Sequence, residues 1–549
     1  MIESDYPMSI ISYFEEIVKY IQDHSLRVYL ILVNVLLVVF AIWFSNVGLL
    51  PFKNLSDFSV FVGLGLILAL YRPGWAFLFF VGTIALENIN LAPDVLRIAL
   101  RPYQFFAALT IAALLLRAVQ KKSPVKFPQM NWADWAVAVF GSVGFVSALL
   151  AVEKEIAFKQ SIVALSFVAI YLLVRAFVQN ISDVKKVLPF FLSSSLVVLI
   201  YGIWQNVRFA KGLEHFEVMP GRSNATFAEA DWLGMFIVFL LAVIFSIIFY
   251  SDKKTKTIIS SFQFPIFNKF SVLQFLNYVV LVLLFIVLII TVARSAWLGA
   301  AVVSVGFLKI ILIDGLWKVA DWRWKKTGWA MLGILAALGI ALGSVKLFDI
   351  SSFELSNRAQ STTSGLQGIT ISCENENSNV PQKIENIDEL SRYGCRHIDL
   401  EEIESEKAQG RFVGTVLRPD PNFNVRSEIY EKSWNEIKNN PVFGIGWGNI
   451  GKILGTDESG NFLNSSNMFL EAWLGAGIVG LICLVFVFGF ILFKSLMLFY
   501  RGSDGEKTIA AFAALGAFAI LVPNLFNAGI FLGFLWVFLG IAVSLVSKE

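Results

Sequence analysis

Fourteen long apolar runs recur along this chain of 549 residues, and they constrain its fold more than any other feature. A helix needs roughly 17–25 apolar residues to cross the hydrocarbon core of a bilayer. Because lipid offers no water to pair with backbone N–H and C=O groups, such runs must be helical. We therefore predict an all-α polytopic membrane protein with about 12–14 transmembrane helices. The expected spans are 28–46, 57–71, 74–91, 99–118, 133–151, 159–178, 187–205, 231–250, 273–292, 295–314, 328–348, 475–498, 507–524 and 526–545.

Composition excludes an ordinary soluble enzyme, since 57% of the residues are hydrophobic and 15% are charged. A soluble domain carries about a quarter charged residues. The first 26 residues begin acidic and lack the pattern of a signal peptide. Ile10, Phe14, Ile17 and Ile21 recur there at helical spacing. We predict that 1–26 forms an interfacial segment, with a disordered tail as the alternative.

Basic residues set the expected orientation, because Lys and Arg accumulate in cytoplasmic loops. If every span is real, one side of the membrane collects five basic loops, and both termini join that side. Their basic residues are Lys121, Lys122, Lys126, Arg175, Lys185, Lys186, Lys253, Lys254, Lys256, Lys269, Lys318, Arg323, Lys325, Lys326, Arg501 and Lys507. This side is predicted to be the cytoplasm.

The chain divides into a transmembrane bundle of about eleven helices at 27–348, a large external loop at 349–470, and C-terminal membrane helices at 471–549. The external loop holds 18 acidic and 11 basic residues, a net charge of −7, which supports its translocation. Cys373 and Cys395 lie in this loop, 22 positions apart. Because the exterior is oxidising, they are expected to form a disulfide, with two unpaired thiols as the alternative.

Four arginines fall on the predicted external side, where positive charge is normally scarce. Arg222 lies in "PGRSNATFAEADWLG", Arg294 in the tight turn of "TVARSAWLGA", Arg358 in "ELSNRAQS", and Arg426 at the start of "RSEIYEKSWNEIKNN". A guanidinium keeps its charge and binds phosphate through two parallel hydrogen bonds. The arrangement points to an anion-binding site, and the alternative is snorkelling of each arginine to lipid headgroups.

The stretch "KNNPVFGIGWGNIG" follows a predicted amphipathic helix that carries Tyr430, Trp434 and Ile437 on one face. Its glycines, Gly444, Gly446 and Gly448, suit a backbone that takes positive φ or approaches another group closely. We expect them to bring backbone N–H groups to a ligand. An ordinary tight turn is the alternative.

Together these motifs resemble the O-antigen ligase and polymerase superfamily. The resemblance rests on "ARSAW", on the spacing Arg426-x₁₄-Pro441-x₂-Gly444-x-Gly446-x-Gly448, on "SSNMFLEAWLGAGIVGL" and on the upstream "RSNATFAEADWLGMFI". It covers about residues 200–490. The first six predicted spans match only as generic hydrophobic helices.

The resemblance implies a multi-pass protein of the bacterial cytoplasmic (inner) membrane with one large periplasmic loop. Its implied activity is metal-independent transfer of a glycan from an undecaprenyl-pyrophosphate-linked oligosaccharide to a glycan or lipid-linked acceptor. Arg222, Arg294 and Arg426 would hold the donor pyrophosphate as the catalytic set, with Arg358 and the three glycines as further substrate contacts. No cofactor, nucleotide sugar or nucleic acid is expected, while membrane lipid and other polysaccharide export proteins are candidate partners.

One departure from the family pattern concerns the residues that re-enter the membrane. Lipid-A-core ligases of this family carry a histidine just before the asparagine of that segment, and here Ser466 precedes Asn467. A hydroxyl does not serve as a base at neutral pH as histidine does. We expect Ser466 and Asn467 to contact substrate, or Ser466 to cap the helix. Glu229, Asp231 and Glu471 are candidate bases, with a charge at a helix start as the alternative role.

Two other functions fit parts of the sequence. A protein O-oligosaccharyltransferase would use the same donor and transfer it to Ser or Thr. A small-solute or anion transporter would show ionisable residues at the membrane midplane and broken helices in matching halves. Glu87 is the clearest candidate for a buried charge, but the sequence shows no internal repeat. No nucleotide-binding glycine motif or metal-ligand spacing is present.

Overall fold

A computed structural model gives the fold for most of the chain. It describes all residues except 1–24, 121–126, 220, 255–271, 315, 317, 349, 351–364, 375–379, 399–401, 420, 457–461 and 548–549. The predicted interfacial helix in the first 26 residues therefore lies almost wholly outside the described residues. Arg358 and five of the lysines that set the expected orientation lie outside them too.

Ten of the described helices are long and apolar enough to cross a membrane. They are α2 (Ser25–Asn46), α5 (Pro102–Val119), α6 (Trp132–Leu150), α7 (Lys154–Phe177), α8 (Ile181–Ala210), α9 (Ala230–Lys254), α11 (Arg294–Ile313), α12 (Trp324–Leu347), α17 (Met468–Arg501) and α18 (Asp504–Asn524). Four shorter apolar helices join them, namely α3 (Leu55–Tyr71), α4 (Pro73–Gly82), α10 (Val272–Ile290) and α19 (Gly533–Val546). The prediction of an all-α polytopic membrane protein is confirmed.

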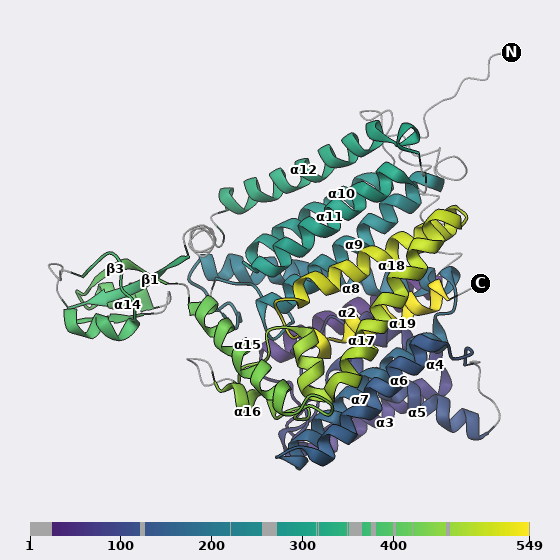
Figure 1. Cartoon of the computed structure of the whole chain (residues 1–549), viewed down its shortest axis with the longest axis horizontal. Coiled ribbons are helices and arrows are strands. Elements are labelled where there is room, and N and C mark those ends of the chain that lie inside the picture. The colour runs from purple at the N-terminus through teal and green to yellow at the C-terminus, as the bar shows by residue number, and fades with distance from the viewer. Residues whose placement is uncertain are drawn as a thin grey trace.

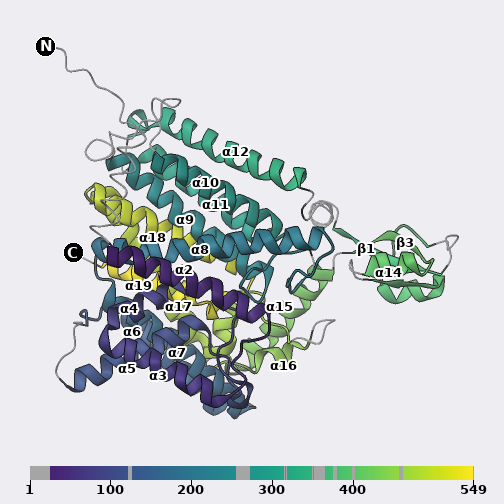
Figure 2. The same cartoon turned by 180° about the vertical axis from the view of Figure 1, so that it is seen from behind.

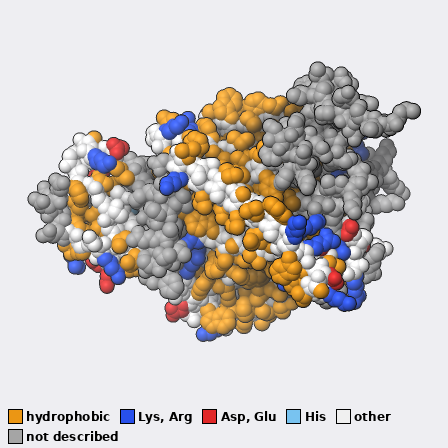
Figure 3. Space-filling model, turned by 90° about the horizontal axis from the view of Figure 1, so that it is seen from above, with side chains coloured by type: hydrophobic (Ala, Val, Ile, Leu, Met, Phe, Trp, Pro, Cys, Tyr) orange, Lys and Arg blue, Asp and Glu red, His pale blue; other side chains and the backbone are white. Residues whose placement is uncertain are grey.

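The long helices run side by side in one bundle, and a small sheet projects from one end of it (Figures 1 and 2). Helix α2 begins and α19 ends at the opposite end of the bundle (Figure 2). Helix α17 lies against α6 and α18, and α9 lies against α11 and α18. Hydrophobic side chains cover the middle of the face seen in Figure 3, with charged side chains toward its ends. This distribution suits a protein with its middle in lipid.

Two predicted spans have wrong boundaries, because the chain leaves the helix inside each apolar run. The span predicted at 74–91 ends as a helix at Gly82, and the span predicted at 526–545 begins as a helix at Gly533. The two irregular segments are bonded to each other, since the buried Glu87 carboxylate accepts a 2.6 Å hydrogen bond from the Gly533 N–H. Irregular backbone is tolerated at such depth where protein surrounds it.

The loop predicted at 349–470 contains a three-stranded antiparallel sheet that the sequence reading did not anticipate. Its order is β2-β1-β3, from β2 (Cys395–His397), β1 (Leu366–Cys373) and β3 (Phe412–Pro419). The buried Glu406 carboxylate accepts hydrogen bonds from Ser372, Arg396 and Arg411 and so ties the sheet to α14. The remaining short helices are η1 (Asp94–Leu96), η2 (Val319–Asp321), η3 (Ile387–Tyr393), α14 (Ile403–Ala408), α15 (Pro421–Asn439), α16 (Ile450–Leu454) and η5 (Gly529–Phe531).

Cys373 and Cys395, the pair expected to bridge, face each other across β1 and β2 and form a disulfide. Closing a loop of this length removes entropy from the unfolded chain and stabilises the fold by about 3 kcal/mol. We therefore expect Cys373→Ser to lower the unfolding midpoint of the sheet region, measured by limited proteolysis during a temperature ramp. In a Cys483→Ala background, which removes the free thiol, alkylation of the denatured protein should shift gel mobility only after reduction. A shift without reductant would contradict the bridge.

The sheet also offers a test of the predicted orientation. Glu385 is exposed in the sheet region, whereas Lys325 is exposed at the far end of the bundle, in the first turn of α12. We expect Glu385→Cys to react with a membrane-impermeant thiol reagent on intact spheroplasts. Lys325→Cys should react only after lysis. The opposite pattern would place the sheet in the cytoplasm and contradict the prediction.

Candidate active site

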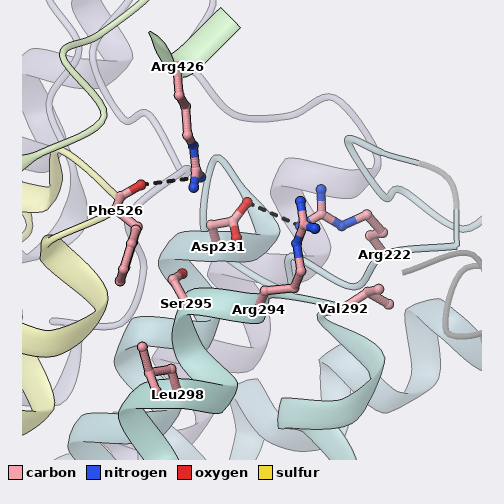
Figure 4. A pocket seen from close by; sticks show the side chains of 8 residues that line it. All are labelled: Arg222, Asp231, Val292, Arg294, Ser295, Leu298, Arg426 and Phe526. Carbon is pink, nitrogen blue, oxygen red and sulfur yellow. Dashed lines mark hydrogen bonds and ion pairs between the residues drawn. The ribbon is translucent and has the colours of Figure 1, made fainter. Parts of the chain in front are cut away.

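Three of the four arginines predicted to be external meet in one pocket of about 230 Å³ (Figure 4). Arg222 comes from the loop between α8 and α9, Arg294 is the first residue of α11, and Arg426 lies on α15. Their guanidinium groups point into the same space from different sides, around Asp231 (Figure 4). The other lining residues are Val292, Ser295, Leu298 and Phe526.

Arg222 is buried and held by neighbouring groups. Its Nε donates to the Thr291 carbonyl at 3.2 Å, and one Nη donates to the Asp231 carboxylate at 3.1 Å. Thr291 precedes Val292, whose φ of 52° makes the tight turn before α11. The turn between α10 and α11 therefore fixes both Arg222 and the start of the helix that carries Arg294.

The N-terminus of α11 adds to the positive potential of the pocket. The first N–H groups of a helix have no partner within it, and the helix dipole places partial positive charge there. Arg294 occupies the first position of this 20-residue helix, where a cation is intrinsically unfavourable. With three arginines and one carboxylate, the pocket lining has a formal charge of +2. Such a site favours an anion.

Arg426 reaches the pocket from the segment between the membrane helices α12 and α17. One Nη donates to the Phe526 carbonyl at 3.4 Å, and α15 is anchored on the bundle by the buried Ile429 and Ile437. Phe526 belongs to the irregular segment between α18 and α19, which sequence reasoning did not connect with the site. The run "VPNLFNAG", with two asparagines, a proline and a glycine inside an apolar stretch, is the signal that marks it.

Of the three candidate bases, the structure places one in the pocket. Asp231 lies in the first turn of α9 and lines the pocket. Glu229 precedes α9 and does not line it. Glu471 lies in the first turn of α17, where its carboxylate accepts a 3.0 Å hydrogen bond from the Ser465 N–H. Asp231 is therefore the candidate base that the structure brings to the arginines.

The glycine-rich loop at 442–448 inserts into a break in α17. Gly477, with φ of 66°, interrupts the helix. The Leu474 carbonyl accepts N–H bonds of 2.7 and 3.2 Å from this loop, and the Ile478 N–H donates to Val442 at 3.2 Å. The loop thus satisfies the backbone groups that the break leaves unpaired.

The three glycines adopt the positive φ values that their sequence predicted, from 69° to 85°. A Cβ at Gly444 would lie 2.3 Å from the Leu474 carbonyl oxygen, and one at Gly448 would lie 2.6 Å from the Ile156 side chain. Trp447 between them is fully buried. The close approach is to the protein's own helices, and none of the three glycines lines the arginine pocket.

Ser466 and Asn467 lie beside the pocket wall and do not line the pocket. The Asn467 side chain caps α17 by accepting from the second and third backbone N–H groups of the helix, and its amide donates to the Leu525 carbonyl at 3.0 Å. The alternative that Ser466 is the cap is therefore wrong. Ser466 instead takes a φ of 50° in the turn before the helix.

No cluster of three or more metal-binding side chains occurs within the part of the chain that the structure describes.

One region of the chain matches a known protein family. Residues 279–485 match the family described as O-antigen ligase. This match covers 207 of the 549 residues and supports the predicted resemblance to the O-antigen ligase and polymerase superfamily. The matched O-antigen ligase region includes Arg294, Arg426 and the glycine-rich loop, whereas Arg222 and the segment between α18 and α19 lie outside it. No curated protein matches the chain.

The match, together with the apolar helices, supports a multi-pass membrane protein with glycan-transferring activity in polysaccharide assembly. An O-antigen ligase family member works on a lipid-linked glycan donor and an acceptor at the membrane. The pocket joins the matched region to residues before and after it, since Arg222 and Phe526 complete its lining.

Proposed function

We propose that the protein transfers a glycan from an undecaprenyl-pyrophosphate-linked donor to a sugar hydroxyl and thereby polymerises a cell-surface polysaccharide. The reaction would take place at the outer face of the bacterial cytoplasmic membrane, with both termini in the cytoplasm. The observation that carries this proposal is the meeting of Arg222, Arg294 and Arg426 in one pocket. A lining with formal charge +2 suits a pyrophosphate.

The proposed chemistry is a displacement at the anomeric carbon of the donor. The acceptor hydroxyl oxygen forms the new glycosidic bond, the bond from carbon to pyrophosphate oxygen breaks, and undecaprenyl pyrophosphate leaves with the electron pair. Negative charge grows on the leaving phosphate during this step. Preorganised cationic donors at that position stabilise the transition state more than the ground state. The three arginines would supply this stabilisation.

Asp231 would take the proton of the acceptor hydroxyl. In the structure its carboxylate accepts a 3.1 Å hydrogen bond from Arg222, which occupies one of its oxygens. A pyrophosphate in the pocket would compete for the same guanidinium. We propose that donor binding draws Arg222 toward phosphate and leaves the Asp231 carboxylate available to the acceptor, so that the base is released when the donor is in place.

The remaining predicted residues would act by positioning. The glycine-rich loop follows α15 directly and is bonded to α17, so it sets where Arg426 stands. Asn467 binds the backbone of Leu525, next to the Phe526 carbonyl that holds Arg426. Direct contacts of Gly444, Gly446, Gly448 and Ser466 with the glycan stay a prediction, as do contacts with other polysaccharide export proteins.

The choice of acceptor is tested with the purified protein in lipid nanodiscs. We offer a lipid-pyrophosphate oligosaccharide donor with the same lipid-linked unit, with lipid-A core, or with a Ser/Thr-containing acceptor protein. Product formation with the lipid-linked unit, seen as a ladder on a gel, is the expected result. Transfer to lipid-A core or to the protein would replace polymerisation by ligation or protein glycosylation.

Ser466→Ala provides a specific prediction in the same assay. The Ser466 side chain is not at the pocket, so we expect the rate of polymer formation to fall by no more than about threefold, equivalent to less than 1 kcal/mol of transition-state stabilisation. Kinetics over a range of donor concentrations measure the effect. A loss of about a hundredfold would instead give Ser466 a direct role in chemistry.

A further inference from the structure

We propose that the Ser295 hydroxyl donates a hydrogen bond to the pyrophosphate of the lipid-linked glycan, and that Asn527 orients this hydroxyl. This inference rests on the proposed function and adds two residues to its machinery. Ser295 is the second residue of α11, directly after Arg294, and it lines the pocket (Figure 4). Asn527 comes from the irregular segment between α18 and α19, outside the O-antigen ligase match.

The direction of one hydrogen bond decides what Ser295 can offer. The Asn527 amide nitrogen donates to the Ser295 Oγ at 2.9 Å and to the Pro523 carbonyl at 3.0 Å. An amide nitrogen only donates, so the Ser295 oxygen must accept. The hydroxyl proton of Ser295 is then available to donate. The described residues supply no other hydrogen-bond partner for this hydroxyl.

The surroundings favour an anionic oxygen as the partner of that proton. Ser295 is 8% exposed, and what it exposes faces a pocket lined by three arginines. It also stands in the first turn of α11, where backbone N–H groups favour negative charge. Accepting a bond from Asn527 polarises the hydroxyl and strengthens the bond that it donates. A phosphate oxygen placed among the arginines would receive this bond.

The segment between α18 and α19 brings two groups to the pocket. Its backbone places the Phe526 carbonyl against Arg426 and the Asn527 side chain against Ser295. The fold of this segment is itself fixed by Asn524, whose side chain accepts from the Gly529 N–H at 2.8 Å. The segment is thus one wall of the pocket, and Asn527 is a positioning residue that acts through Ser295.

The test uses the full-length protein in nanodiscs and measures kcat and KM for transfer from a lipid-pyrophosphate oligosaccharide. Ser295→Ala should lower kcat/KM by at least about tenfold, because one donor to the developing phosphate charge is lost. Ser295→Thr keeps the hydroxyl and should stay within about threefold of the unmodified protein. Ser304→Ala, on the same helix and outside the pocket lining, should change nothing.

Asn527→Asp is the variant that separates positioning from packing. It preserves the size of the side chain but replaces the amide donor by a carboxylate, which only accepts. Ser295 would then turn its proton toward position 527, away from phosphate. We expect the same loss as for Ser295→Ala, and no further loss when the two changes are combined. Size-exclusion chromatography and thermal unfolding check that each variant is folded.

Binding of undecaprenyl pyrophosphate, measured by native mass spectrometry, distinguishes failure of this inference from failure of the proposed function. If the unmodified protein binds and Arg294→Lys weakens binding while Ser295→Ala retains full binding and activity, the inference about Ser295 is wrong and the arginine site stands. If the unmodified protein neither binds the lipid nor transfers glycan, both are wrong. Loss in Ser295→Ala with recovery in Ser295→Thr supports the proposal.

Discussion

Replacing Arg294 or Arg426 by lysine is expected to lower kcat/KM for glycan transfer by about a hundredfold, and replacement by alanine by more. Lysine keeps the positive charge but loses the planar pair of N–H groups that grips a phosphate through two oxygens. The two guanidinium groups approach the pocket from opposite sides (Figure 4). A shorter-reaching ammonium at either position would leave one side of the pyrophosphate without its contacts.

The effect is measured as initial rates over a range of donor concentrations, with Arg208→Lys as the matched control. Arg208 lies near the end of α8, contacts the Trp204 ring and the Glu214 backbone, and does not line the pocket. We expect the control to retain its rate. Unchanged rates in both Arg294→Lys and Arg426→Lys would falsify the assignment of the pyrophosphate site to this pocket.

A second large effect is expected at the break in α17, where Gly477→Ala should destabilise the fold by about 2–5 kcal/mol. A Cβ at position 477 would stand 2.0 Å from the Val442 carbonyl oxygen, and the φ of 66° is itself costly for alanine. Since the neighbour is backbone, it cannot rotate away. The glycine-rich loop would be pushed off the helix, and α15 with Arg426 would lose its position.

Gly489→Ala on the same helix is the control, because a Cβ there meets no atom within 4 Å. Its expected effect is neutral or stabilising by up to about 1 kcal/mol, as for alanine in a helix interior. Thermal unfolding in detergent, followed by tryptophan fluorescence, compares the two variants. Equal stability of Gly477→Ala and Gly489→Ala would mean that the loop is not bonded into α17 as the structure has it.

Much of the membrane fold was predictable because spanning helices leave a local signal in the sequence. Each of the fourteen apolar runs corresponds to a described helix. The helix ends at Gly82 and Gly533 were not predictable, because the chain leaves the helix where a distant partner satisfies its backbone. The bond between Glu87 and Gly533 joins residues 446 positions apart, which no local pattern encodes.

The small sheet was missed for a similar reason. Its central strand reads "LQGITISC", a short run without long-range context, inside a segment whose charge marked it only as external. The strand is stabilised by pairing with β2 and β3 and by the buried core around Ile369 and Ile371. Such pairing depends on residues up to about fifty positions away and is more context-dependent than helix propensity.

The sequence predicted the charged residues of the candidate site but not the segment around Phe526 that forms one of its walls. Arginines on an external face are unusual enough to be noticed, so Arg222, Arg294 and Arg426 could be named from sequence. The Phe526 contact is made by a backbone carbonyl, which any residue possesses, so the run "VPNLFNAG" signals only that the segment is irregular. The glycines predicted close approach correctly, but they approach the protein's own helices, α17 at Gly444 and α7 at Gly448.

The most direct test of the proposed pyrophosphate site is a structure of the full-length protein with undecaprenyl pyrophosphate, determined by electron cryomicroscopy in nanodiscs. Both phosphates are predicted to lie in the pocket, with oxygens within hydrogen-bond distance of the Arg222, Arg294 and Arg426 guanidinium groups. The Asp231 carboxylate should then no longer be bonded to Arg222 and should be accessible to the acceptor. Pyrophosphate bound elsewhere on the protein, with these arginines holding other partners, would contradict the account.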